Sequence, residues 1–164
     1  MSTLKVVEIG GWAVSNNPED ILRTYGLGSC IALVFHHPGT KTMGLVHIAL
    51  PSLLCHNGKN RGEGYYASSA VPLLLNEVHA LAGLYSSEGS GIVAKLAGGA
   101  AFIKTKNPFH LGERILSEIV HTLRRLRIPL VNQDTGGTVS RTVSLYIGRG
   151  DVTVKYPGTQ ERPL

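Results

Sequence analysis

A cysteine stands where a glycine-rich segment of the chain gives way to an apolar one. Residues 24–35 read TYGLGSCIALVF, in which Gly26, Gly28 and Ser29 precede Cys30. A thiolate is a strong nucleophile, but a thiol with an ordinary pKa of ~8.5 is only slightly ionised at neutral pH. Cys30 could therefore act as a catalytic nucleophile with a base beside it, usually a histidine. The alternative is an inert cysteine that packs as a small apolar side chain.

Hairpin geometry favours one of the chain's seven histidines as that base. They are His36, His37, His47, His56, His79, His110 and His121. A two-residue turn at Pro38 and Gly39 would place Cys30 directly opposite His47, because the two lie equally far from the turn. Their Cβ atoms would then be ~5 Å apart on one face of the hairpin. A longer turn would change this pairing, and a shift of one residue would send His47 to the other face.

A histidine at this position would need partners for its ring. His47 lies in the apolar segment GLVHIALP, and an unpaired imidazole is unfavourable to bury. A third group should also fix which ring nitrogen carries the proton. The carboxylates nearest to Cys30 in sequence are Glu19 and Asp20, whereas Thr24 lies at the end of the preceding predicted strand, next to its last residue, and offers a hydroxyl and a carbonyl. Cys30 and His47 are therefore candidate catalytic residues, and Glu19, Asp20 and Thr24 stay open as candidates for the third group.

The residues just before the cysteine could hold a substrate oxygen. Gly26 and Gly28 have no Cβ, so they let the backbone N–H groups of Ser29 and Cys30 approach a substrate closely. Such N–H groups could form an oxyanion hole for a tetrahedral intermediate. We therefore expect Gly26, Gly28 and Ser29 to form an oxyanion or substrate loop.

Other chemistries fit the sequence less well. The G-x-G pattern before Cys30 leads into a predicted strand rather than a helix, so it does not match a dinucleotide-binding loop. A zinc site built from Cys30, His47, Cys55 and His56 would lack a second closely spaced pair of ligands. The segment DTGG at 134–137 is typical of a turn. We expect no metal and no cofactor.

The composition is that of a compact domain. The chain has 164 residues, of which 43% are hydrophobic and 16% charged, and a chain of this length usually forms one domain. The net charge is +5, but the basic residues are scattered and few aromatic residues lie among them. This distribution argues against a nucleic-acid platform.

Nothing in the sequence indicates a membrane or an oxidising compartment. No apolar run approaches the ~18 residues of a membrane span, and the start of the chain does not resemble a signal peptide. Two cysteines do not make a disulfide framework. We expect a cytoplasmic protein without membrane insertion.

Apolar periodicity and turn residues predict an α+β fold. Strands are expected over 4–9, 21–25, 30–36, 42–50, 91–96, 129–133, 140–147 and 151–155. One helix is expected over 69–82, with Ser69 as its N-cap because Pro72 suits only a first turn. A second is expected over 111–126, where the apolar residues form one face. Two main helices on one face of a mostly antiparallel or mixed sheet would give a single-domain α/β sandwich.

Four segments of the chain together resemble the CheD family of chemoreceptor glutamine deamidases. They are TYGLGSC, GLVHIALP, KLAGGAAF and DTGGTVSRTVSLYIGRGDVTVK. Their order and separations are similar to those of the family over residues 4–156. We expect one CheD-like domain over 1–164, with a flexible tail at 157–164. The resemblance also implies a fold similar to the catalytic domain of the cytotoxic necrotizing factor toxins.

The resemblance implies a cysteine-dependent hydrolysis that turns receptor glutamines into glutamates and releases ammonia. In such an enzyme Cys30 would be the nucleophile, His47 the base and Thr24 the residue that orients His47. The cytoplasmic domains of chemoreceptors would be the substrate, and a CheC-type phosphatase would be a further partner. Two alternatives stay open: a weakly catalytic or non-catalytic regulator of a CheC-type phosphatase, and a toxin-like deamidase of another protein.

Overall fold

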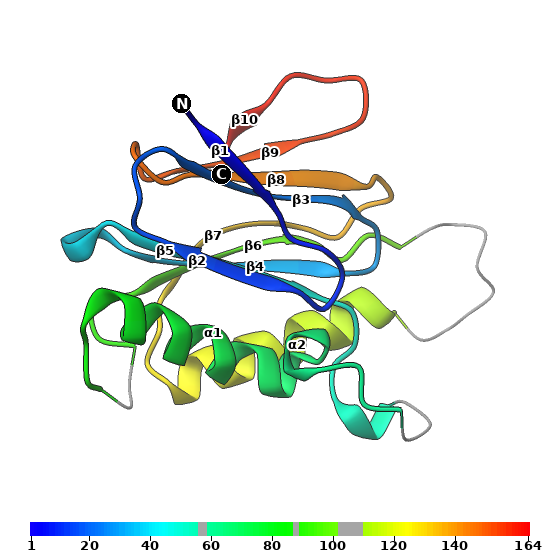
Figure 1. Cartoon of the computed structure of the whole chain (residues 1–164). Helices are drawn as coiled ribbons and strands as arrows, with labels where there is room; N and C mark the ends of the chain where they lie inside the picture. The colour runs from blue at the N-terminus through cyan, green and yellow to red at the C-terminus, as the bar shows by residue number, and fades with distance from the viewer. Residues whose placement is uncertain (56–58, 87–88, 102–109) are drawn as a thin grey trace.

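The computed structural model describes residues 1–55, 59–86, 89–101 and 110–164, which form two stacked sheets and a layer of helices (Figure 1). Sheet A contains, in spatial order, β1 (Thr3–Val6), β3 (Asp20–Leu27), β8 (Arg141–Tyr146), β9 (Asp151–Lys155) and β10 (Arg162–Pro163). Sheet B contains, in spatial order, β2 (Trp12–Ser15), β5 (Thr42–Ile48), β4 (Ile31–His37), β6 (Val93–Gly98) and β7 (Leu130–Thr135). Both sheets are mixed, because β1–β3 and β6–β7 pair in parallel and the other pairs are antiparallel.

The helices are α1 (Ala67–Ala82) and α2 (Leu111–Arg125), and both cover the face of sheet B that points away from sheet A (Figure 1). Three short 3₁₀ turns, η1 (Pro38–Thr40), η2 (Leu53–Cys55) and η3 (Glu63–Tyr65), complete the described elements. The predicted α+β class, with two main helices on one face of a mixed sheet, is confirmed. The strands divide between two sheets rather than forming one.

Strand β4 explains why the layers hold together. Leu33 and Phe35 pack into the core between sheet B and the helices, whereas Ala32 and Val34 pack into the core between the two sheets. Successive side chains of a strand point to opposite faces, so a strand buried on both faces reads as a continuous apolar run. The centre of sheet B is therefore rigidly packed, and the residues at the start of β4 extend from it.

The predicted start is confirmed for one helix and wrong for the other. Helix α2 begins at Leu111 as expected, but α1 begins at Ala67 and its N-cap is Tyr66 rather than Ser69. The first amides of α1 are satisfied by backbone instead of a capping side chain, since Ala67 and Ser68 donate to the carbonyls of Leu50 and Pro51 at 2.8 and 3.0 Å. The chain leaving β5 thus caps the helix, a contact that local sequence does not reveal.

Two short strands were not predicted. Strand β2 lies in a segment rich in turn residues and pairs with β5. Strand β10 pairs with β9, and Leu164 is only 7% exposed, with its N–H donating to the carbonyl of Val152 at 2.9 Å. The expectation of a flexible tail over 157–164 is therefore corrected, because this segment closes back onto sheet A. Across the described ranges, no helix has the length and hydropathy needed to span a bilayer.

Candidate active site

The chain crosses from sheet A to sheet B between β3 and β4, and a bulge in β3 prepares this crossing. Thr24 pairs with Val143 and Leu27 with Arg141, so β3 advances three residues while β8 advances two. Gly26, inside the bulge, has φ +65° and open space around its Cβ direction. Its backbone conformation, not lack of room, therefore requires glycine. The bulge turns the chain so that residues 28–30 lead directly into β4.

The pairing predicted for Cys30 and His47 is wrong by two positions. The structure pairs His47 with Ala32, because Pro38–Thr40 form a 3₁₀ turn and Lys41 adopts a left-handed φ of 54°, which lengthens the hairpin loop. An even shift keeps a side chain on the same face. Cys30 accordingly packs against the same core between the sheets as Ala32. Cys30 and His47 are thus diagonal neighbours, for which typical separations are ~7–8 Å, within reach of a long side chain.

Thr24 fixes the proton of His47 on one ring nitrogen. The hydroxyl oxygen of Thr24 lies 2.7 Å from His47 Nδ1 and 2.7 Å from the carbonyl oxygen of Val7. A carbonyl can only accept, so the hydroxyl donates its proton to Val7 and must accept a proton from His47. Neutral His47 therefore carries its proton on Nδ1, and its Nε2 has a free lone pair.

That lone pair is buried, and none of the described residues pairs with it. His47 is 1% exposed, and its Nε2 makes no hydrogen bond to any described residue. Leaving a buried polar atom unpaired costs about 1–3 kcal/mol, and such atoms call for a specific explanation. Burial also lowers the pKa of His47 to about 4. At neutral pH the ring is an uncharged base that the fold retains at the expense of stability.

The thiol of Cys30 is half-buried and uncharged at rest. Burial raises the pKa of the Cys30 thiol, and the residue's own backbone N–H opposes this only in part. Both shifts disfavour charge, so the resting site holds a thiol and a neutral imidazole rather than a preformed ion pair. Charge would develop only when a substrate carbon is attacked.

The predicted oxyanion loop is partly available for substrate. The N–H of Gly28 is taken, because it donates to the carbonyl of Gly26 at 2.9 Å. The N–H groups of Ser29 and Cys30 donate to no carbonyl in the part of the chain that the structure describes. Gly26 and Gly28 thus shape the loop, while Ser29 and Cys30 offer the donors.

Several backbone contributions were not predicted from sequence. The carbonyl of Val7 determines the tautomer of His47, and the backbone of His47 is held by hydrogen bonds to Gly10 and Gly11 at 2.8 and 3.1 Å. Backbone groups carry no residue-type signal, so only the fold reveals them.

The zinc set weighed from the sequence is only partly within the described residues. Among the described residues, no three His, Cys, Asp or Glu side chains gather in a way that could hold a metal ion. His56 of the weighed zinc set lies outside the described residues, and Cys55 lies in η2.

Comparison with known proteins places the chain in a family. Residues 49–156 match the family model described as CheD chemotactic sensory transduction. A probable chemoreceptor glutamine deamidase CheD of Syntrophotalea carbinolica is 37% identical, over 93% of this chain and 94% of that protein. A probable chemoreceptor glutamine deamidase CheD 2 of Anaeromyxobacter dehalogenans is also 37% identical, over 99% of both chains. The chemoreceptor glutamine deamidase CheD of Thermotoga maritima is 33% identical, over 96% of this chain and 95% of its own.

The chain belongs to the CheD family. The segment matched by the family model begins after Thr24, Cys30 and His47. The match to that model and the geometry around these three residues are therefore independent observations.

Proposed function

We propose that this protein is a chemoreceptor glutamine deamidase whose nucleophile is Cys30. Relatives that are 33–37% identical over nearly its whole length bear that activity in their names. The observation that carries the mechanism is the unpaired, unprotonated Nε2 of His47, on the same face of sheet B as the thiol. A buried base whose Nε2 has no partner among the described residues, on the same face as a half-buried thiol, suits the activation of a cysteine nucleophile.

The first step forms a thioester through a tetrahedral intermediate. His47 Nε2 accepts the thiol proton as Cys30 Sγ bonds to the carbon of a glutamine carboxamide, and the C=O electron pair moves onto oxygen. The N–H groups of Ser29 and Cys30, which donate to no carbonyl in the described segments, stabilise that oxygen, and one such donor contributes about 3–4 kcal/mol to a transition state. The protonated ring then gives its Nε2 proton to the departing nitrogen, and ammonia leaves.

The second step releases glutamate. Water attacks the thioester carbon while His47 Nε2 accepts one of its protons, and that proton returns to the sulfur as the thioester bond breaks. Through both steps Nδ1–H stays bonded to Thr24, whose hydroxyl stays bonded to Val7. This proposal needs no metal and no cofactor, because every proton moves through one ring nitrogen.

The proposed substrates also suggest a cellular location for the protein. Chemoreceptor cytoplasmic domains would be its protein substrates, and we propose the cytoplasm as its location, where a thiol nucleophile stays reduced. A CheC-type phosphatase as a further partner stays a prediction from the family resemblance.

Incubation with a chemoreceptor cytoplasmic fragment tests the proposal. The expected result is a gain of one mass unit for each converted glutamine, because a carboxamide –NH₂ becomes –OH, with release of an equal amount of ammonia. Intact-mass and peptide-mass spectrometry locate the sites. A fragment with glutamates at those sites is the control and should not change. A glutamine-containing fragment that keeps its mass would overturn the proposal.

A further inference from the structure

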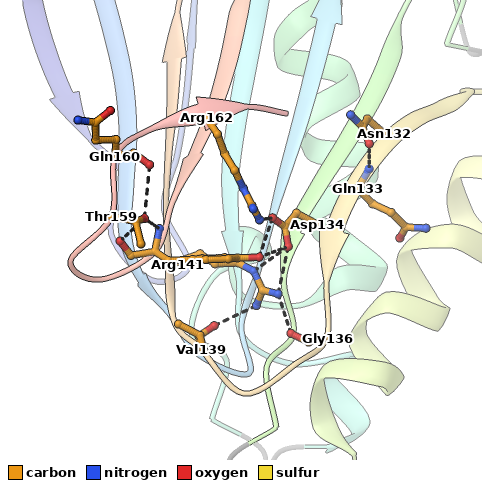
Figure 2. Close-up of polar contacts among 10 residues, drawn as sticks. Asn132, Gln133, Asp134, Gly136, Val139, Arg141, Thr159, Gln160 and Arg162 are labelled. Atoms are coloured by element: carbon orange, nitrogen blue, oxygen red, sulfur yellow. Dashed lines mark hydrogen bonds and ion pairs between the residues drawn. The ribbon is translucent and has the colours of Figure 1, made fainter.

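A buried arginine at the start of β8 forms the centre of a polar network with the end of β7 (Figure 2). Arg141 is only 4% exposed, and its Nε and Nη2 each lie 3.2 Å from one oxygen of Asp134. Asp134 also accepts from Arg162 Nη2 at 2.6 Å and from the hydroxyl of Tyr156 at 2.9 Å. Hydrogen bonds with a charged partner are about twice as strong as neutral ones. The carboxylate therefore orients the Arg141 guanidinium firmly.

The remaining donors of Arg141 hold the loop that follows β7. Nη2 donates to the carbonyl of Gly136 at 2.7 Å and Nη1 to that of Val139 at 3.1 Å (Figure 2). Gly136 and Gly137 have φ of +82° and +70°, conformations that glycine adopts without strain and that shape this loop. A planar guanidinium can reach a carboxylate and two carbonyls at once, which a lysine ammonium cannot do in the same geometry.

That loop in turn holds the chain that leaves β6. Gly136 N–H donates to the carbonyl of Gly98 at 2.9 Å, and Ala101 N–H donates to the carbonyl of Gly137 at 2.8 Å. Two hydrogen bonds therefore fix segment 98–101 to the loop that Arg141 orients.

Segment 98–101 makes direct contact with the backbone around the nucleophile. Gly99 N–H donates to the carbonyl of Cys30 at 2.9 Å, and Ala100 N–H donates to the carbonyl of Gly28 at 2.8 Å. The carbonyl of Gly28 and the N–H of Ser29 belong to one planar trans peptide, so they point in opposite directions. Because the N–H of Ala100 holds the carbonyl of Gly28 in place, the direction of the Ser29 N–H is fixed as well.

We propose that Arg141 is a positioning residue for the deamidation. Through loop 136–140 and segment 98–101 it fixes the peptide between Gly28 and Ser29, and so aims the Ser29 N–H at the oxygen of the tetrahedral intermediate. The inference rests on the proposed function and adds to it a residue that touches no reacting atom. It also gives the segment DTGG a role, since this segment carries Asp134 and the carbonyl of Gly136.

The variant Arg141→Lys tests this role, with Arg149→Lys as its matched control. Arg149 also pairs with an aspartate, Asp151, at 3.2 Å and lies over an aromatic ring, that of Tyr146, but its side chain is 64% exposed and, among the described residues, has no hydrogen bond or ion pair to the segments above. Removing one oxyanion donor typically lowers kcat about 10²–10³-fold. A misdirected donor in Arg141→Lys should lower kcat by about 10–100-fold with little change in KM, and Arg149→Lys should match the unmodified protein.

Two further readouts separate positioning from general damage. Alkylation of Cys30 by iodoacetamide needs the thiolate but no oxyanion donor, so its rate and pH profile should not change in Arg141→Lys. Amide hydrogen exchange of Gly99 and Ala100 should become faster. Equal losses of kcat and alkylation rate, or unchanged kcat and unchanged exchange, would overturn the inference.

A second variant and a second measurement test the role of Arg141 if Arg141→Lys does not fold or if no deamidation is observed. Asp134→Asn removes the charge that orients Arg141 and replaces Arg141→Lys if the latter does not fold. If the unmodified protein shows no deamidation, the proposed function fails by itself. Hydrogen exchange then still decides whether Arg141 controls segment 98–101: faster exchange supports that coupling, and unchanged exchange overturns it.

Discussion

Cys30→Ala is expected to abolish conversion of receptor glutamines, with a loss of at least about 10⁴-fold in kcat. Without sulfur, no covalent intermediate forms, and the base and the oxyanion donors have only an ordinary water molecule to activate. The protein should remain folded, because alanine fits the core between the sheets that Cys30 borders. Mass spectrometry of a receptor fragment measures the loss.

The second cysteine provides the control for this experiment. Cys55→Ala removes the only other thiol of the chain and should leave the conversion rate unchanged. Residual conversion by Cys30→Ala at a rate near that of the unmodified protein would show that another group attacks the substrate.

His47→Gln should lower kcat by about 10³-fold, within the range that general acid–base catalysis contributes. Glutamine keeps a polar side chain at the position but has no nitrogen that can accept the thiol proton. The thiol would then rely on its own ionisation, which burial already disfavours. The same variant should alkylate more slowly with iodoacetamide at neutral pH.

The free energy of unfolding of His47→Gln shows whether the variant loses activity because the base is missing or because the protein unfolds. The ring of His47 makes one side-chain hydrogen bond, between Nδ1 and Thr24 at 2.7 Å, and its buried Nε2 has no partner among the described residues, so removing the ring loses only about 0.5–1.5 kcal/mol of hydrogen bonding. The free energy of unfolding should therefore change much less than the activity. His121→Gln, at an exposed position on α2, is the matched control. Activity of His47→Gln within a few-fold of the control would contradict a base at position 47.

The sequence predicted the shared face of the site but not its register. Strand alternation put Cys30 and His47 on one side of the hairpin, and this held because the error of two positions is even. The loop length was wrong because a 3₁₀ turn and a left-handed Lys41 extend it. Thr24 lies 2.7 Å from His47 Nδ1, while its catalytic role stays a prediction, and the contact of its hydroxyl with the Val7 carbonyl depends on β1 lying beside β3.

Elements with strong local signals were predicted best. The apolar face of α2 and the two-sided burial of β4 follow from periodicity alone. Strand β10, the cap of α1 and the network of Arg141 depend on partners far along the chain. A residue pattern cannot reveal which distant carbonyl will meet an amide, so these features appear only in the folded protein.

The central claim is that Thr24 holds the proton of His47 on Nδ1 and leaves Nε2 free as a base. Nitrogen-15 NMR of the histidine-labelled protein tests it most directly. We expect a neutral ring at pH 7 with Nδ1 protonated and Nε2 unprotonated, titrating far below the ordinary 6.5 and near a pKa of about 4. Thr24→Val should weaken this preference, because valine cannot accept from Nδ1–H. A ring protonated on Nε2, or one already charged at neutral pH, would contradict the account.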